Sequence, residues 1–576
     1  MAPKLKISSS VIQRLGKLKN PSTCRLYGVI FDDSLLVLSF SLDVSNTYNS
    51  RIFQLSLPAE IYLCGVLIVD GEEEDIYKAF KDVDVTDNPL LLKYSTKITE
   101  CNIETFFYIH QKLEIASFEI LSEYDIWQKF TYIRLEANLS LNSQRWNILE
   151  TIEEARKNIA AGKAGFYLPK GNVYLLGEDA VDTGNSELLN LSINYEGIGH
   201  SKHDVKTPPR VVDAFSVSMY LKVSKDRLSD EGVKYAPVIQ HVKREFDCLE
   251  FQVKIDALAF VRRDILTTTL YSTLVESACR NLRLLERAVQ HELSVHKMDS
   301  FKIPDIVHFR PQNIGHLLTF IFPTNEETAL EFRRTLHDFL ALPRNQPYFR
   351  NGNIVKFQGD MRKNEPLINP HESVPSPGIV DAKVALVDGL YAYYHYMQDN
   401  FDDNGWGCAY RSLQTIISWF RLQGYTEKSV PTHNTIQKCL VDIGDKPYDF
   451  IGSKQWIGSM EVGFVLETLL GITIKINRVS VGEEMASLGP MLESHFATQG
   501  TPIMIGGGVL AHTILGVAYN ETTGDIKFLI LDPHYTGVEI LPTILSKGWC
   551  GWKTKDFWKK DAFYNLCLPQ RPVSRI

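Results

Sequence analysis

The chain is interrupted once by a stretch that regular secondary structure does not readily cross. Residues 364–383, NEPLINPHESVPSPGIVDAK, contain four prolines and show no periodic pattern of apolar residues. Proline lacks the N–H group that helices and sheets use, so this composition predicts a linker or an extended strap between domains. A chain of 576 residues is also long enough for at least two hydrophobic cores. We therefore expect an N-terminal region over 1–370, a linker over 371–383 and a C-terminal domain over 384–576.

The N-terminal region combines strand patterns with helix patterns. Between residues 24 and 70, three segments rich in β-branched and aromatic residues have the pattern of strands: CRLYGVIF, SLLVLSFSLDV and EIYLCGVLIV. Further along, apolar residues recur at helical spacing in STLVESACRNLRLLERAVQHEL and in EETALEFRRTLHDFLALP. The region is therefore predicted to be a mixed α/β or α+β platform.

Charge and hydropathy exclude two classes of function. The formal net charge of -8 disfavours binding to nucleic acid, because phosphate recognition needs a strongly basic surface. The N-terminus has lysines but no apolar core of a secretory signal. The longest fully apolar run, residues 61–69, has about half the length of a membrane span. We expect no direct membrane span, so that any membrane association comes through a partner.

The cysteines indicate a reducing compartment. Nine of them are scattered singly, with no CxxC pair and no His/Cys cluster at zinc spacing. The pair His200 and His203 has no acid or cysteine pattern beside it and is read as surface. We therefore expect a cytoplasmic protein with no metal site and no cofactor.

The C-terminal domain carries the clearest local patterns. Apolar spacing predicts a helix from Cys408 to Leu422, which Gly424 ends. A second helix is expected to open at Ser459 as N-cap, with Glu461 in its first turn. Two strands should follow, PIMIGGGVLAHTILGVAYN, interrupted by glycines, and DIKFLILDPHYTG, with NETTGD as the hairpin turn between them.

Cys408 lies where a nucleophilic cysteine would be placed. It stands at the expected start of a helix, where unsatisfied N–H groups and the helix dipole lower a thiol pKa. Gly405 and Gly407 allow a sharp turn and the close approach of a substrate, and Trp406 between them could wall a narrow cleft. A Gly-Trp-Gly turn is also compatible with a well-packed corner, so this stretch alone leaves the two readings balanced.

A general base must come from another part of the chain. Asp532 and His534 are separated by one residue, so in an extended segment both project from one face, where the acid can orient the imidazole. His512 offers a papain-like order with Asp532 as its acid, but its apolar neighbours favour a buried structural histidine. We prefer His534, because it follows the apolar part of its strand, where a cleft can form.

An acyl transfer also needs donors for the developing oxyanion. The amide N–H of Cys408 is one candidate, since it is free at a helix start. A tyrosine hydroxyl could be the second, and the sequence pattern does not choose among five tyrosines: Tyr391, Tyr393, Tyr394, Tyr396 and Tyr410.

Four motifs together resemble a known family. GWGCAYRSLQT, SKQWIGSMEVG, GGGVLAHTILGV and LDPHYTG occur in order over about residues 385–570. They resemble the cysteine proteases specific for the ubiquitin-fold modifier, and the chain as a whole looks like the longer, type 2 branch. The resemblance implies an α+β protein with a papain-like protease domain at the C-terminus. The segment LPAEIYLCGVLIVDGEEE is reminiscent of an MPN-type fold, but the metalloprotease motif of that fold is absent.

The resemblance also implies roles for individual residues. Cys408 would be the nucleophile, His534 the general base and Asp532 its orienting partner. Tyr396, twelve residues before the cysteine, would be the second oxyanion donor. Trp406, Gly405 and Gly407 would bind substrate as a narrow gate that admits a glycine-ended tail.

The implied activity is processing of the modifier precursor to expose its C-terminal glycine, and removal of the modifier from target lysines. The implied partners are the modifier, its conjugates and a membrane adaptor that recruits a cytoplasmic enzyme to the cytosolic face of the endoplasmic reticulum. Two alternatives stay open. One is an autophagin-like protease for another ubiquitin-like modifier, and the other is a non-enzymatic scaffold at the endoplasmic reticulum.

Overall fold

The fold divides into two compact units. The computed structural model describes residues 3–43, 48–71, 80, 83, 88–97, 102–110, 112–144, 147–169, 172–177, 214–221, 248–295, 302–311, 314–360 and 365–573. Among these, the first unit runs to Leu342 and includes Ile354–Asp360, and the second contains Pro343–Asn353 and the chain that follows 361. His200 and His203 lie outside the described residues.

The first unit contains two main sheets. An eight-stranded sheet has the order β7-β6-β5-β4-β2-β3-β1-β8. Its strands are β1 Lys4–Ser8, β2 Ser22–Phe31, β3 Ser34–Leu42, β4 Tyr62–Val69, β5 Leu90–Tyr94, β6 Ile103–Ile109, β7 Lys112–Ile115 and β8 Phe118–Leu121. A five-stranded sheet has the order β11-β10-β12-β9-β13. Its strands are β9 Phe130–Gln144, β10 Ala164–Leu168, β11 Val173–Leu176, β12 Ala214–Leu221 and β13 Cys248–Arg262, and a separate ribbon joins β14 Ile306–Phe309 to β15 Leu318–Ile321.

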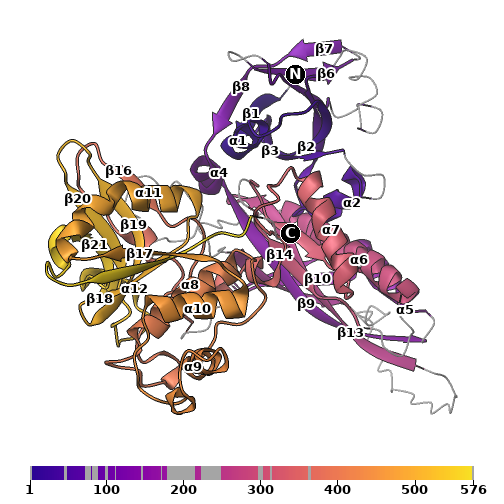
Figure 1. The fold of residues 1–576 in the computed structure, drawn as a ribbon. Coiled ribbons are helices and arrows are strands. Elements are labelled where there is room, and N and C mark those ends of the chain that lie inside the picture. Colours follow the sequence, from indigo (N-terminus) through magenta and orange to yellow (C-terminus); the bar gives the residue numbers. More distant parts are fainter. Residues whose placement is uncertain are drawn as a thin grey trace. The chain divides into compact units, whose positions relative to one another are not determined.

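Helices cover these sheets (Figure 1). They are α1 Ser9–Leu15, α2 Ser50–Leu55, α4 Glu123–Lys129, α5 Ile148–Asn158, α6 Thr267–Val295 and α7 Glu326–Phe339. In α6 the buried apolar residues recur every three or four positions, for example Leu274, Ala278 and Leu282, and they share one core with β9, β10 and β13. The mixed α/β prediction for this region is therefore confirmed, including the three strands between residues 24 and 70.

The second unit is a mixed layer structure built on one antiparallel sheet. The path is β17-β22-β18-β19-β20-β21, and β16 pairs with β19. The strands are β16 Lys383–Leu386, β17 Ile474–Val479, β18 Ile503–Gly507, β19 Leu510–Tyr519, β20 Ile526–Leu531, β21 Cys550–Thr554 and β22 Tyr564–Pro569. The helices are α8 Cys408–Leu422, α9 His433–Asp442, α10 Ser459–Leu470, α11 Gly489–Thr498 and α12 Leu541–Ser546. Helices α8 and α10 lie on one side of the sheet and α11 on the other (Figure 1).

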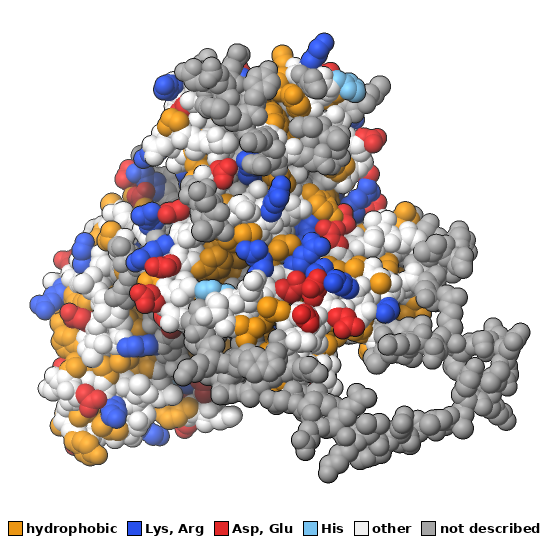
Figure 2. Space-filling model, turned by 90° about the vertical axis from the view of Figure 1, so that its right-hand side faces the viewer, with side chains coloured by type: hydrophobic (Ala, Val, Ile, Leu, Met, Phe, Trp, Pro, Cys, Tyr) orange, Lys and Arg blue, Asp and Glu red, His pale blue; other side chains and the backbone are white. Residues whose placement is uncertain are grey.

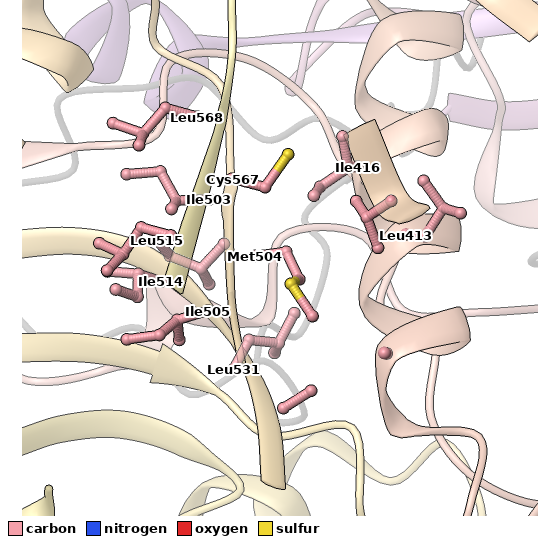
Figure 3. Close-up of a cluster of buried hydrophobic side chains, with 14 of the residues drawn as sticks. Leu413, Ile416, Ile503, Met504, Ile505, Ile514, Leu515, Leu531, Cys567 and Leu568 are labelled. Atoms are coloured by element: carbon pink, nitrogen blue, oxygen red, sulfur yellow. The ribbon is translucent and has the colours of Figure 1, made fainter. Parts of the chain in front are cut away.

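The core of this unit fixes α8 against the sheet. Figure 3 shows Leu413 and Ile416 of α8 beside Met504 of β18 and Cys567 of β22, and all four side chains are fully buried. Complete burial of an aliphatic side chain stabilises a fold by about 1.5–3 kcal/mol. The hydroxyl groups of Ser412 and Thr513 also hydrogen-bond at 2.7 Å between α8 and β19. The helix therefore has a single docking position on the sheet.

Three local predictions for the second unit were confirmed in part. Helix α8 has the predicted bounds, and Gly424 follows it with a φ of +83°. Helix α10 also begins at Ser459, but Ser459 is not its N-cap. The cap is Gly458, whose N–H donates to Glu461 at 2.9 Å, while the Ser459 hydroxyl donates to the carbonyl of Asn565.

The prediction of a single strand interrupted by glycines was wrong. PIMIGGGVLAHTILGVAYN forms two antiparallel strands, β18 and β19, paired from Ile503 to Leu510. The chain reverses at Gly508 and Val509, which have φ values of +56° and +76°. Glycine adopts such a value at little cost, so Gly508 permits the tight reversal, whereas Val509 holds a φ that a β-branched residue rarely adopts.

The proline-rich segment lies within the second unit, so the structure draws the boundary before residue 371. Carbonyl groups of this segment accept hydrogen bonds from side chains of the sheet. The Trp552 Nε1–H donates to Pro375 at 3.1 Å, and the Lys527 amine donates to Pro377 at 2.6 Å. The segment is thus held along β20 and β21. Within the described residues, no helix combines the length and the apolar character needed to cross a bilayer.

Candidate active site

Cys408 is the first residue of α8, and a tight turn delivers it there. The Asp403 carbonyl accepts the N–H groups of Trp406 and Gly407 at 3.2 and 2.9 Å, and the Gly407 carbonyl then accepts the N–H of Arg411. Gly405 has a φ of +84°, which a residue with a side chain rarely adopts. A Cβ atom on Gly407 would lie 2.5–2.8 Å from the Asp403 side chain. Both glycines are therefore explained by the turn itself.

The Asp403 carboxylate lies beneath this turn and is fully buried. It pairs with the Arg411 Nε at 2.6 Å, lies 3.0 Å from the His433 Nε2, and accepts the N–H of Met397 at 2.8 Å. Burial opposes the charge, but the contacts with His433 and Arg411 outweigh it and hold the pKa of Asp403 below its usual value. One carboxylate thus joins the segment before residue 400 to the start of α8.

Trp406 does not form the expected wall of a cleft. It is only 7% exposed and belongs to the core of the second unit. Its ring packs against Phe401, Tyr410 and His433 with centroid distances of 5.8, 5.5 and 5.4 Å. The gate prediction was wrong for Trp406, because the turn directs this side chain inward.

Asp532 and His534 follow the end of β20. The His534 Nδ1 and the Asp532 Oδ1 are 2.6 Å apart, and the backbone N–H of His534 donates to the same oxygen at 3.0 Å. Their proximity was expected, but they lie in a turn and not in an extended strand. The carbonyl of Pro533 accepts the N–H of Tyr396 at 3.0 Å, and the Tyr393 hydroxyl donates to the carbonyl of Asp532. These two hydrogen bonds therefore fix the backbone that carries the acid–imidazole pair.

The thiol of Cys408 and the imidazole of His534 form an interacting pair. Burial disfavours the Cys408 thiolate, but His534 and the Ala511 amide stabilise it, so the pKa of Cys408 is lowered. Burial also disfavours charged His534, but Asp532 and Cys408 outweigh it and raise the pKa of His534 to about 9. Within the described part of the chain, the buried His534 Nε2 is not hydrogen-bonded, so it is available to the thiol. The pair therefore favours a thiolate beside an imidazolium at a lower pH than an isolated cysteine would.

Of the five candidate tyrosines, Tyr396 is the one placed at the thiol. Burial and the neighbouring Cys408 thiolate raise the pKa of Tyr396, so its hydroxyl stays protonated and can donate, and the Cys408 amide lies against the same oxygen. Its ring stands at 89° to the His534 ring with the centroids 5.3 Å apart. The hydroxyls of Tyr393 and Tyr410 donate instead to the carbonyls of Asp532 and Gln455. The Tyr391 hydroxyl is hydrogen-bonded with the His371 Nδ1 at 2.8 Å.

His512 lies closer to the site than its sequence context indicated. Its Nε2 is 3.8 Å from the Asp532 Oδ2, beyond hydrogen-bond distance, and its ring is 5.2 Å from that of His534. Burial lowers the pKa of His512 to about 4, which makes it neutral at physiological pH. Ligand atoms of His512, Asp532 and His534 all lie within 4.8 Å of one another. Because Asp532 Oδ1 already accepts two hydrogen bonds from His534, the arrangement is that of an acid–imidazole pair.

Sequence reasoning missed Asp403, Arg411 and His433, and it assigned no role to Trp456 within the motif SKQWIG. Trp456 is 58% exposed, and its Nε1–H donates to the carbonyl of Gly405 at 3.3 Å. It is therefore the exposed aromatic beside the Cys408 turn, in the place that Trp406 was expected to occupy. An isolated acid and an isolated tryptophan carry no spacing signal, so only the fold could identify them.

Replacing Asp403 by Ala is expected to lower the free energy of unfolding by about 3–5 kcal/mol, because Arg411, 1% exposed, would keep a buried charge without its partner. Denaturant unfolding measures this change. Glu521→Ala is the matched control. The side chains of the pair Lys383–Glu521 are 51% and 56% exposed, so the loss there should be below about 1 kcal/mol. Equal losses in the two variants would contradict a structural role for the buried pair.

The Cys408–His534 pair predicts a bell-shaped pH dependence of turnover. Turnover should rise as Cys408 loses its proton below the ordinary thiol pKa, and it should fall as the pH passes about 9, where His534 loses the proton that it must donate. In His534→Ala the thiolate would lose its main stabilising partner while burial still opposes its charge, so alkylation of Cys408 by iodoacetamide at pH 7 should slow at least about tenfold. Burial raises the pKa values of Cys550 and Cys567 to about 12, which makes these thiols internal controls. An unchanged alkylation rate would exclude the ion pair.

Comparisons with known proteins identify the family of the chain. The model of peptidase family C78 matches residues 382–567, an insect UFM1-specific protease N-terminal MPN-like domain matches residues 1–126, and the N-terminal domain of ubiquitin-fold modifier 1 specific protease 2 matches residues 200–362. The chain is similar to a probable Ufm1-specific protease 2 of Drosophila melanogaster, with 38% identity over the full length of both chains. It is 49% identical to human Ufm1-specific protease 2 over 62% of this chain and 76% of the human protein.

Among solved structures, the UfSP crystal structure from C. elegans has the same fold, with a TM-score of 0.67 and 23% identity over the whole of both chains. The full-length identity to the fly protein exceeds what shared fold alone requires. The chain therefore belongs to the Ufm1-specific protease 2 family, whose catalytic part is the cysteine peptidase family C78.

Proposed function

We propose that this chain is a thiol protease that cuts after the C-terminal glycine of Ufm1, both in the modifier precursor and in its conjugates with target lysines. The observation that carries the proposal is the arrangement of Cys408, His534 and Asp532 at the start of α8, with Tyr396 beside the thiol. Relatives that align along the full chain are named for action on the same modifier, and they support it over an autophagin-like substrate.

Each group has a step in the proposed reaction. The Cys408 thiolate attacks the carbonyl carbon of the terminal glycine, and the oxyanion that forms accepts hydrogen bonds from the Tyr396 hydroxyl and the Cys408 amide. The His534 imidazolium then gives its proton to the departing amine, which leaves a thioester. Neutral His534 next takes a proton from water, the hydroxide attacks the thioester, and the thiol leaves as thiolate. Asp532 holds the His534 Nδ1–H throughout.

We assign the selection of a glycine-ended tail to the residues around Gly405, and not to Trp406 as the sequence had suggested. We propose that the exposed Trp456 ring covers the last residues of the bound tail, since its Nε1–H anchors it on the turn that precedes Cys408. A side chain on the terminal residue would then meet this ring, whereas glycine would pass. Gly405 and Gly407 contribute through the shape of the turn.

Capture by Ufm1 with a C-terminal electrophilic warhead tests the activity. We expect a covalent adduct at Cys408 that is absent in Cys408→Ser and His534→Ala and largely kept in His512→Ala.

Tyr396→Phe should lower turnover by on the order of ten- to a thousandfold with little change in binding, because one oxyanion donor is removed. Adduct mapping by mass spectrometry and precursor cleavage are the measurements.

Three outcomes would each overturn part of this assignment. Capture that needs His512 and not His534 would restore the papain-like alternative for the base. Cleavage of an autophagy modifier precursor without cleavage of the Ufm1 precursor would refute the substrate. If cells with Cys408→Ser kept an unchanged level of conjugates, a non-enzymatic scaffold at the endoplasmic reticulum would become the better description.

We also propose that the protein is cytoplasmic and that its first unit recruits it, through a membrane adaptor, to the cytosolic face of the endoplasmic reticulum. The support is that this unit is large and contributes none of the four groups named above to catalysis. Fractionation of cells that express the tagged full chain should find part of it with reticulum membranes, released when the adaptor is removed. Complete recovery in the cytosolic fraction under all conditions would contradict recruitment.

A further inference from the structure

The first unit contains a hollow lined by arginines, far in sequence from Cys408. A cavity of about 340 Å³ opens between α2 and α6, with Arg51 and Gln54 on α2 and Glu276, Arg280 and Arg283 on α6. The three α6 residues recur at helical spacing, so they share one face of the helix. Figure 2 views the side of the molecule on which these helices lie, and Lys and Arg side chains gather near the middle of that face beside Asp and Glu.

The charged groups at the floor of this hollow already have hydrogen-bond partners. Arg280 is only 6% exposed, and its Nη1 donates to the carbonyls of Pro58 and Ile61 at 3.0 and 3.1 Å. Its Nε and Nη2 donate to Glu276 at 2.9 and 2.6 Å. Glu276 also accepts a hydrogen bond from the Tyr62 hydroxyl. Glu276 and Arg280 therefore neutralise each other, and neither is available to compensate the charges at the rim.

The rim carries charge without compensation. The side chains of Arg51 and Arg283 are exposed and form no ion pair with any residue that the structure describes. Arg287, one turn further along α6, likewise pairs with no carboxylate among the described residues. The nearby Glu286 is paired with Arg156 at 2.7 Å. Arg51 and Arg283 thus line one hollow on a chain whose net charge is -8, and like charges in proximity cost free energy unless an anion joins them.

We propose that this arginine hollow, with Arg51 and Arg283 exposed at its rim and the paired Arg280 at its floor, is a docking site for an acidic segment of a protein partner. Guanidinium groups bind carboxylates in a two-point geometry, which suits Asp and Glu side chains. Leu55 and Cys279 add apolar lining, which a peptide can contact and a free inorganic ion cannot use. Arg283 and Arg287 are separated by about 6 Å along the helix, which matches side chains spaced along a polypeptide better than one phosphate group.

The proposal concerns binding only and is independent of the protease assignment, so the failure of one leaves the other intact. The test uses the full-length chain and a fluorescein-labelled peptide of alternating Glu and Gly, with the same peptide carrying Gln in place of Glu as probe control. We expect fluorescence anisotropy to show saturable binding of the Glu peptide that weakens as salt is raised. The double variant Arg51→Gln/Arg283→Gln should lose at least about tenfold in affinity, as expected when charge-assisted hydrogen bonds are removed.

Arg334→Gln is the matched control variant. It removes one exposed arginine from α7 in the same unit without touching the hollow, and it should bind as the unchanged chain does. Circular dichroism checks that all variants are folded. Equal affinity of the double variant and Arg334→Gln, or equal binding of the Glu and Gln peptides, would overturn the proposal. Binding to inorganic phosphate or to phosphatidylserine vesicles without binding to the Glu peptide would overturn it in favour of an ion or lipid site.

Discussion

The arrangement of the active site depends on the buried carboxylate of Asp403. This side chain lies at the point where the nucleophile and the oxyanion donor enter the fold from different parts of the chain. It accepts the N–H of Met397, next to Tyr396, and it pairs with Arg411, one turn into the helix that Cys408 begins. Through its own carbonyl it also closes the turn that contains Gly407. A buried charge tolerates little displacement, because each lost contact leaves an unpaired group in a medium of low dielectric constant.

The base reaches the thiol by a different route. Asp532 and His534 stand at the end of β20, so their position is set by the sheet, whereas Cys408 is set by α8. The two are brought into register by the core between α8 and β18, by the hydrogen bond of Ser412 with Thr513, and by the bond from Tyr396 to Pro533. The consequence is chemical. Burial alone would raise the pKa of the Cys408 thiol, but it is lowered because an imidazolium is held beside it.

The sequence predicted those features of the site that depend on neighbours along the chain. The bounds of α8, the stop at Gly424 and the proximity of Asp532 to His534 follow from helical spacing, from the conformational freedom of glycine and from a separation of two residues. Trp406 was misread, because nothing in Gly-Trp-Gly states whether the ring points into the core or toward solvent. The glycines of GGGVLAH were read as an interruption and not as a reversal, since a left-handed φ at Val509 is not expected of a β-branched residue.

By itself, the sequence determined that the chain has a helix beginning at Cys408, an acid–imidazole pair near residue 532 and a mixed α/β region before both. Local periodicity and residue chemistry are enough for these, because they involve contacts within a few positions. Local patterns left five tyrosines open and only the family resemblance pointed to Tyr396, which the structure places beside the thiol. The tertiary structure alone decided that Trp456 and not Trp406 is exposed beside it, and that Arg51 and Arg283 line one hollow between α2 and α6. Those pairings join residues from twelve to more than two hundred positions apart, and packing of the hydrophobic cores, not any pattern along the chain, selects them.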